Sequence, residues 1–188
     1  GSGFEFYDDL YWNTGISSYI DKLETNSSAS ATMKKQEGSY FDTFFNHTFN
    51  YDKRNQRYKT TDGFISRFTQ NIPIISDTYT LTNSYDYKTY NQWLGENILS
   101  LGFYLKSTNS LNGEDVKLSD RLYLPSSKLR GFESGKVGPK DGASFIGGNY
   151  LSSMNIATTL PQVLPSLQNT NFSLFFDAAN IWGIDYSS

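Results

Sequence analysis

The chain of 188 residues has no cysteine and one histidine, and each shortage excludes a class of function. Without cysteine there is no disulfide framework, thiol nucleophile or cysteine-based zinc or iron–sulfur site, and one histidine cannot build a histidine-rich metal site. A formal net charge of −3 gives no general reason to expect nucleic acid binding. No nucleophile–base pair is apparent either, so we expect no enzyme, no metal, no cofactor and no nucleic acid partner.

Long hydrophobic runs are also missing, since no aliphatic stretch approaches the roughly 20 residues of a membrane-spanning helix. Aromatic residues are abundant instead: 14 Phe, 14 Tyr and 3 Trp make up 16% of the chain, although the mean hydropathy is only −0.52. An ordinary soluble domain takes more of its apolar surface from aliphatic residues. The arrangement of the aromatic residues is therefore the first clue to the fold.

Apolar and polar residues alternate with a period of two along several long segments. Between residues 39 and 51 the odd positions hold Phe41, Phe45, His47, Phe49 and Tyr51, and the even positions are mostly polar. Similar alternation predicts strands at 81–89, 97–107, 150–160 and 172–182, with weaker candidates at 12–23, 28–36 and 62–72. Turn-rich connections separate them, one of them at 161–170, and the polar, glycine-rich residues 108–142 predict a functional loop.

Two environments require strands with one apolar face and one polar face. A soluble β-sandwich buries the apolar faces against each other, whereas a membrane β-barrel turns them towards lipid. Strands of about 9–11 residues suit a tilted membrane crossing. Aromatic residues near strand ends suit the headgroup level of a membrane, and they are Tyr7, Tyr11, Trp12, Tyr51, Tyr58, Tyr90, Trp93, Trp182 and Tyr186. We therefore predict an all-β fold, an antiparallel transmembrane β-barrel with about seven or eight strands.

A set of short motifs carries a family resemblance. Leu129-Arg130-Gly131-Phe132, followed by Gly138-Pro139 and then Gly147-Gly148-Asn149, resembles the signature of the BamA family of outer-membrane protein assembly factors. This family belongs to the superfamily of bacterial surface-antigen barrels, which also contains two-partner-secretion transporters. The run from Phe175 to Trp182 is similar to a later strand of the family. Asp52-Lys53-Arg54-Asn55 with Asp62-Gly63 is similar to its recurrent turn, with Asn55 in place of a second Asp.

The resemblance implies a 16-strand barrel preceded by periplasmic domains. We expect residues 1–188 to be a partial outer-membrane barrel domain, without the periplasmic domains and the last strands, in which 108–142 is an extracellular loop that folds into the lumen. The implied function is the folding and insertion of β-barrel proteins into the outer membrane of a Gram-negative bacterium. The implied partners are outer-membrane lipid, unfolded barrel clients and accessory assembly lipoproteins. The alternatives are a two-partner-secretion or other translocation barrel, and a soluble β-sandwich that binds carbohydrate.

The resemblance also implies a contact for the loop tip, in which Arg130 pairs with acidic residues on the inner wall. Asp177 is at an odd position of the strand at 172–182, and the odd positions form its polar face. There its carboxylate can accept two hydrogen bonds from a guanidinium. Gly131 allows a tight turn, and we expect Phe132 to wedge apolar surface beside the tip. The family commonly has Glu where this chain has Ala157, so we expect Asp177 to hold Arg130 alone.

Overall fold

A computed structural model describes residues 1–160 and 172–185, so the expected connection at 161–170 and Tyr186 lie outside the described residues. Within the described ranges no helix has the length and apolar character of a membrane span. The elements, in chain order, are β1 (Ser2–Tyr7), β2 (Leu10–Leu23), α1 (Ala31–Lys34), β3 (Gly38–Asp52), β4 (Gly63–Ser76), β5 (Thr80–Gln92), β6 (Ile98–Ser110), η1 (Leu118–Asp120), β7 (Lys140–Asp141), β8 (Ser144–Phe145), β9 (Tyr150–Thr159) and β10 (Ser173–Trp182).

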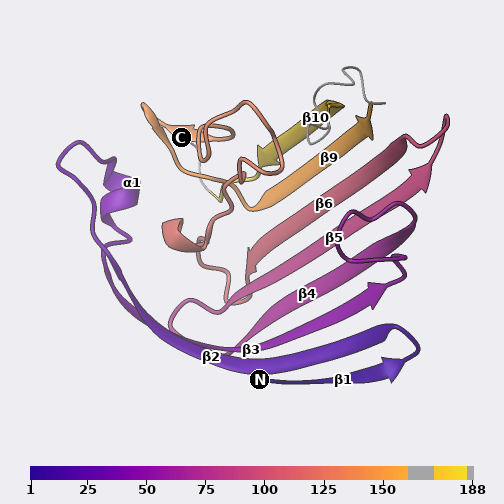
Figure 1. The fold of residues 1–188 in the computed structure, drawn as a ribbon. Coiled ribbons are helices and arrows are strands. Elements are labelled where there is room, and N and C mark those ends of the chain that lie inside the picture. The colour runs from indigo at the N-terminus through magenta and orange to yellow at the C-terminus, as the bar shows by residue number, and fades with distance from the viewer. Residues whose placement is uncertain (161–171, 186–188) are drawn as a thin grey trace.

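Eight strands form one curved antiparallel sheet in the order β1-β2-β3-β4-β5-β6-β9-β10 (Figure 1). Apart from β1, each of these strands is between 10 and 15 residues long, against about 5–6 for an ordinary globular strand. The all-β prediction and the partial barrel are confirmed. The β-sandwich alternative is wrong, because the described residues hold only a hairpin of two-residue strands, β7 and β8, besides this sheet.

Three segments differ from the predicted strand pattern. The weak strand candidate at 28–36 is wrong, because its residues form a turn and α1, whose start is capped by the Ser30 hydroxyl accepting the Met33 N–H at 3.1 Å. The alternation there is too short to outweigh that cap. Strand β1, which pairs along β2, was not predicted, because its alternation covers only Phe4, Glu5 and Phe6. The predicted loop begins later than 108, because β6 continues to Ser110.

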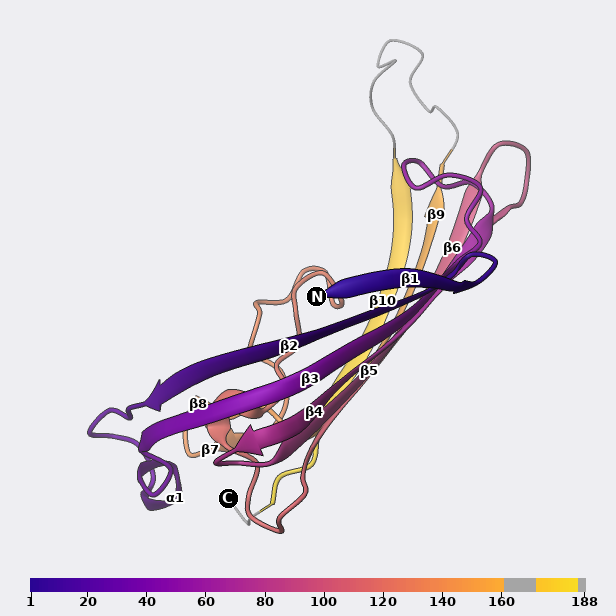
Figure 2. The same cartoon turned by 90° about the horizontal axis from the view of Figure 1, so that it is seen from below.

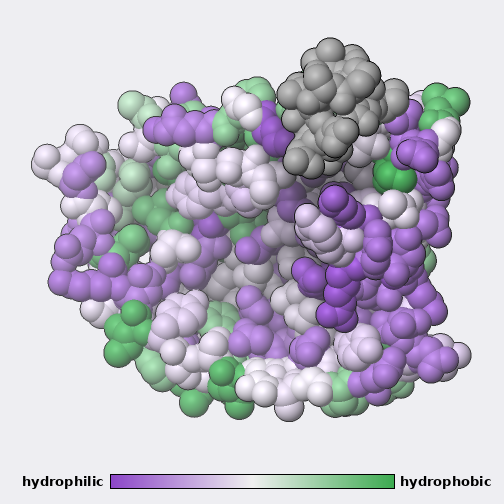
Figure 3. All heavy atoms as spheres, viewed as in Figure 1, coloured by the Kyte–Doolittle hydropathy of each residue, from purple (hydrophilic) through white to green (hydrophobic). Residues whose placement is uncertain are grey.

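The two faces of the sheet differ in chemistry. On the convex face the register places Trp12 opposite Phe49, Phe49 opposite Phe68, and Phe68 opposite Tyr85. Many large apolar side chains of this face are exposed, and hydrophobic residues appear along the lower outer rim in Figure 3. The concave face carries the Asp, Asn, Ser and Thr positions of the alternation and faces the long segment between β6 and β9. The period-two pattern therefore separates an apolar outer surface from a concave face that is mostly polar, apart from the part of β9 and β10 on which the long segment packs.

One row of the convex face is polar and is linked by hydrogen bonds between neighbouring strands. His47 Nε2 lies 3.1 Å from Gln70 Oε1, and Gln70 Nε2 donates to Asn83 Oδ1 at 2.6 Å. The His47 ring also lies 5.5 Å from the ring of Phe49. A polar group on an apolar surface is tolerated where a partner satisfies it. His47 is thus a packing residue of the outer face.

The connections gather at the two ends of the sheet (Figure 2). Helix α1 and the β7–β8 hairpin lie at one end, and the β3–β4 and β5–β6 turns lie at the other. In the β3–β4 turn, Arg54 binds Asp52 with Nε and Nη2 at 2.8 and 2.7 Å. Gly63 closes this turn with φ +92°, and a Cβ there would lie 2.1 Å from the Lys53 carbonyl oxygen. Only glycine fits that position.

Candidate functional site

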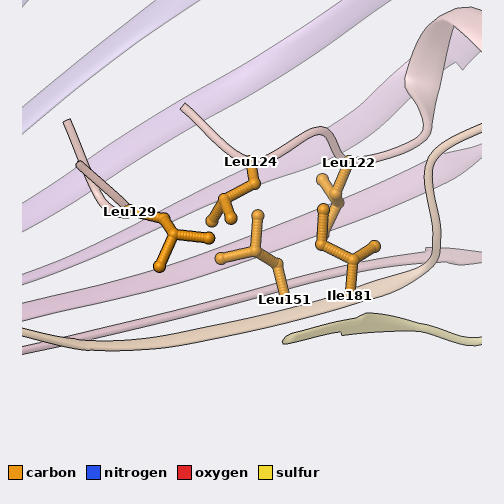
Figure 4. Close-up of a cluster of buried hydrophobic side chains, with 5 residues drawn as sticks. All are labelled: Leu122, Leu124, Leu129, Leu151 and Ile181. Carbon is orange, nitrogen blue, oxygen red and sulfur yellow. The ribbon is translucent and has the colours of Figure 1, made fainter. Parts of the chain in front are cut away.

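The long segment 111–149, which we call the inner loop, crosses the concave face of the sheet (Figure 1). Its leucines supply the main apolar cluster of the molecule, pointing at one another and at the wall strands in Figure 4: Leu122, Leu124 and Leu129 from the loop, Leu151 from β9 and Ile181 from β10. None of the five is more than 8% exposed. The loop is therefore packed onto β9 and β10 through an apolar contact, beside which its charged tip is placed.

Arg130 lies at this tip and binds Asp177 of β10. Its Nε donates to Asp177 Oδ2 at 2.7 Å, its Nη2 donates to Oδ1 at 2.6 Å, and its backbone N–H donates to Oδ2 at 3.0 Å. The Asp177 side chain is 3% exposed, whereas that of Arg130 is 37% exposed. The hydrogen bonds to Asp177 raise the pKa of the Arg130 guanidinium further, so the cation persists at any physiological pH.

Two further groups complete this contact, which we call the Arg130 dock. Asn155 of β9 faces Asp177 in the register, and its Nδ2 donates to Asp177 Oδ1 at 2.8 Å. The Arg130 guanidinium carbon lies 3.8 Å from the centre of the Phe175 ring. Phe175 in turn faces Ala157 in the register. Asp177 is thus the only acidic residue that binds Arg130 among the described residues, as Ala157 led us to expect, but an amide and an aromatic ring assist it.

Lys128 adds a second charged contact, which was not predicted from the sequence. Its Nζ lies 3.0 Å from Asp86 Oδ2 of β5 and 4.4 Å from the centre of the Tyr104 ring of β6. Asp86 is on the polar side of the 81–89 alternation, and Lys128 is two residues from Arg130. The position of Asp86 on the polar face could therefore be predicted from the alternation. Loop residues do not alternate, so the sequence does not indicate that Lys128 is its partner.

The glycine and proline positions of the motif divide into two groups. Gly131 has φ +84° and no atom within 4 Å of the position that a Cβ would take, so it serves the turn and not a close contact. Gly138 and Gly148 both lie against Ile181 of β10, where a Cβ would meet Ile181 atoms at 2.9 and 2.7 Å. The carbonyl oxygen of Pro139 accepts the Ile146 N–H at 3.1 Å, within the hairpin that returns the chain to β9.

Gly147 and Phe132 complete the predicted site residues. Gly147 has φ +68°, and a Cβ there would lie 2.6 Å from the Leu122 carbonyl oxygen. Phe132 is 59% exposed, so the expected apolar wedge beside the tip is made by Leu129 and the other cluster leucines instead. The site is therefore a non-covalent dock for the inner loop, with one ion pair and an apolar cluster at its centre.

The stacked ring of Phe175 gives a testable contribution. We expect Phe175→Leu to weaken the Arg130 dock by about 0.5–1 kcal/mol, the usual size of an exposed cation–π contact. The measurement is the maleimide labelling rate of a Leu129→Cys reporter, which should rise by about two- to fivefold if the tip opens more often. Phe176→Leu, one residue along on the convex face, is the matched control and should leave the rate unchanged. Equal rates in the two variants would show that the ring does not hold the guanidinium.

Comparisons with known proteins agree with this architecture. The sequence model of the Omp85 superfamily domain matches residues 1–188. The Sorting assembly machinery 50 kDa subunit of Saccharomyces cerevisiae is 24% identical over 167 residues, covering 85% of this chain and 34% of that protein. A SAM50-like protein of Schizosaccharomyces pombe is 43% identical over 68 residues, covering 35% of this chain and 14% of that protein. The chain thus spans about a third or less of these curated relatives.

A solved structure shares the fold. BamA from Haemophilus ducreyi lacking POTRA domains 1–3 superposes with a TM-score of 0.79 at 21% sequence identity, covering 96% of this chain and 40% of that one. At this identity the similarity concerns the arrangement of the strands. The curved sheet described above therefore has the architecture of part of a larger barrel.

Proposed function

Because the chain belongs to the Omp85 superfamily, we propose that it is the membrane-embedded part of a factor that folds and inserts other β-barrel proteins into an outer membrane. The observation that carries the proposal is the Arg130 dock, which holds the inner loop in the hollow of the barrel sheet. A barrel whose hollow is occupied by its own loop is poorly suited to be an open pore. A loop held by an ion pair and an apolar cluster can instead be released and docked again.

The proposed partners follow from the two faces of the sheet. The apolar convex face would contact membrane lipid, and the clients would be unfolded β-barrel proteins. The proposed mechanism is non-covalent, with templating of client strands and local disturbance of the bilayer, and it needs no cofactor. Accessory assembly subunits, which would be lipoproteins in a bacterium, complete the proposal. The name of the yeast relative, a sorting assembly machinery subunit, supports an assembly role.

Two outer membranes are candidates for the location of the protein. The BamA resemblance favours the outer membrane of a Gram-negative bacterium, as the bacterial solved structure does. Both curated relatives come from yeasts, and one is 43% identical over its matched segment, which favours the outer membrane of a mitochondrion. We propose the mitochondrial outer membrane because the yeast similarity is the stronger in sequence. A tagged full-length protein that co-fractionated with a bacterial cell envelope in its native cell would overturn this choice.

Depletion of the full-length protein tests the assembly role. We expect the levels of other outer-membrane β-barrel proteins to fall by several-fold within a few cell doublings, while helical membrane proteins stay at their normal level. The measurement is quantitative proteomics of the isolated membrane after alkaline extraction, which removes peripheral proteins. The translocation alternative predicts the opposite pattern, in which barrels are unchanged and one exported substrate accumulates inside. A protein recovered in the soluble fraction would contradict both barrel functions.

A further inference from the structure

A third charged contact lies near the start of the inner loop, on strands that are separated from the Arg130 dock by β4, β5 and β6. Lys117 is 3% exposed, and its Nζ lies 3.2 Å from Asp21 Oδ2 of β2 and 3.4 Å from Asp42 Oδ2 of β3. The Tyr40 ring of β3 lies 4.6 Å away, measured to its centre. Asp120, in the same loop, is 3.9 Å from the ammonium group. A buried lysine thus projects from the loop into an acidic pocket of the opposite wall.

The two residues after Lys117 are bound to the same wall, whereas the N–H of Val116, the residue before it, donates to Asp185 Oδ2 at 2.9 Å, just after β10. The Leu118 N–H donates to Gln36 Oε1 at 2.8 Å, and the Ser119 hydroxyl donates to Asp21 Oδ2 at 2.5 Å. On the wall side, Asp42 is fully buried and accepts the Ser76 hydroxyl. Three consecutive loop residues therefore bind β2, β3 and the connection between them. We call this contact the Lys117 dock.

The cost of burial shows that the Lys117 dock is specific. Burying an ammonium group is unfavourable unless opposite charge and hydrogen bonds replace the water that it loses. Here the carboxylates of Asp21 and Asp42 and the ring of Tyr40 replace it. A loop lysine that served only solubility would stay exposed, as Lys136 of the same loop does.

The two docks lie on different walls of the hollow. The Lys117 dock uses β2 and β3 and the Arg130 dock uses β9 and β10, and β4, β5 and β6 lie between these two strand pairs. We propose that Lys117 is a positioning residue that makes the inner loop a brace across the barrel hollow, tied to both walls. The Arg130 dock and the contact of Lys128 with Asp86 of β5 would leave the loop without a bond to β2 and β3. With both docks closed, the distance between the walls is fixed by the loop.

The docks differ in charge balance, so they differ in how easily they open. Arg130 meets one carboxylate in a bidentate pair, whereas the single ammonium of Lys117 meets Asp21, Asp42 and Asp120. Burial, together with the charges of Asp42 and Asp21, raises the pKa of the Asp120 carboxyl above its usual range. The geometry shows the same imbalance, because three carboxylates lie within 4 Å of one ammonium group. The Lys117 end is therefore the end of the brace that releases first, which would let the walls separate while Arg130 stays bound.

Cysteine labelling tests the brace, because these 188 residues contain no cysteine. Val116 is 1% exposed beside Lys117, and Leu129 is 8% exposed beside Arg130. Val116→Cys reports the opening of the Lys117 dock together with the contact of Val116 to Asp185, and Leu129→Cys reports the opening of the Arg130 dock. Both are made in the full-length protein with any other cysteines replaced. The readout is the rate of maleimide labelling in detergent or liposomes without any client protein.

We expect Lys117→Met to raise the labelling rate of Val116→Cys by about tenfold or more, and to leave that of Leu129→Cys within about twofold. The exposed lysine variant Lys136→Met is the matched control and should change neither rate. Asp120→Asn removes one excess carboxylate, so it should lower or preserve the rate at Val116→Cys. Because Lys117→Met leaves Asp42 buried without a cation, Lys117→Met/Asp42→Asn is the second variant, which removes that penalty and should show the same opening.

The outcomes separate the brace from its alternatives. An unchanged rate at Val116→Cys in both Lys117 variants would overturn the Lys117 dock. A parallel rise at both reporters would show that the loop opens as one unit, which overturns the two-ended brace. A role of the brace in assembly rests on the proposed function. The labelling experiment does not depend on that function, because it is done without a client protein. Its result therefore stands even if depletion of the protein leaves other barrels unchanged.

Discussion

Replacing Arg130 with Ala should detach the tip of the inner loop from β10. In cells that carry the variant, the proposed assembly role predicts a lower level of other outer-membrane barrels. The substitution removes both side-chain hydrogen bonds to Asp177 and leaves that 3% exposed carboxylate with Asn155 as its side-chain partner. Removing one partner of a buried ion pair lowers the stability of the folded state by about 3–5 kcal/mol. We expect the lower end of this range because the Arg130 side chain is 37% exposed. The labelling rate of Leu129→Cys should then rise by about a hundredfold.

Arg130→Lys and the pair Arg130→Ala/Asp177→Ala are the controls for this result. Lysine keeps the charge but cannot form the bidentate contact, so we expect most of the loss to remain. The double variant removes the stranded carboxylate and should recover stability without recovering the dock. If barrel levels stay normal while Leu129→Cys becomes accessible, the dock is structural and the assembly role of Arg130 is wrong. If Leu129→Cys stays protected, the ion pair does not hold the tip.

Strand parity explains why part of the site could be predicted. A period of two fixes which face a side chain occupies, so the position of Asp177 on the concave face follows from the sequence alone. The same parity places Asp42 and Asp86 on that face, but it does not say which loop cation each one meets. Those pairings depend on the path of the inner loop, which has no periodicity. Lys117 and Lys128 were therefore missed while Arg130, which lies in a motif, was found.

Packing preferences explain the other differences. Phe132 was expected beside the tip because an aromatic ring carries a large apolar surface, yet three loop leucines already fill the space against Leu151 and Ile181. The Phe175 ring was assigned only to its strand, and the alternation does not indicate that a guanidinium stacks on it. Which side chain occupies the space beside the tip, and which ring lies beside Arg130, depends on the three-dimensional path of the loop. A single sequence does not carry that information.

Gly148→Ala should prevent the inner loop from closing onto β10. A Cβ at this position would lie 2.7 Å from Ile181 Cγ2 and 2.7 Å from the Trp182 carbonyl oxygen. Gly148 and Leu122 also form two backbone hydrogen bonds with each other, of 2.8 and 3.1 Å. Gly148 therefore cannot move away without breaking these bonds, which hold Leu122 in the leucine cluster. Overpacking of this kind costs about 1–3 kcal/mol and more where backbone is the obstacle. We expect the midpoint of urea unfolding to fall and Leu129→Cys to become accessible.

Gly113→Ala is the matched control, because it separates steric contact from backbone strain. Gly113 lies in the same loop with φ +81° and no atom within 4 Å of a Cβ, whereas Gly148 has its backbone obstacle at a φ that any residue can adopt. Alanine at Gly113 should therefore cost only about 1–2 kcal/mol, the usual strain of the left-handed conformation. It should leave Leu129→Cys protected, because that strain is local to an exposed turn. Accessibility that rose equally in both variants would mean that the loop is sensitive to any change, and that close approach at Gly148 has no special part in seating it.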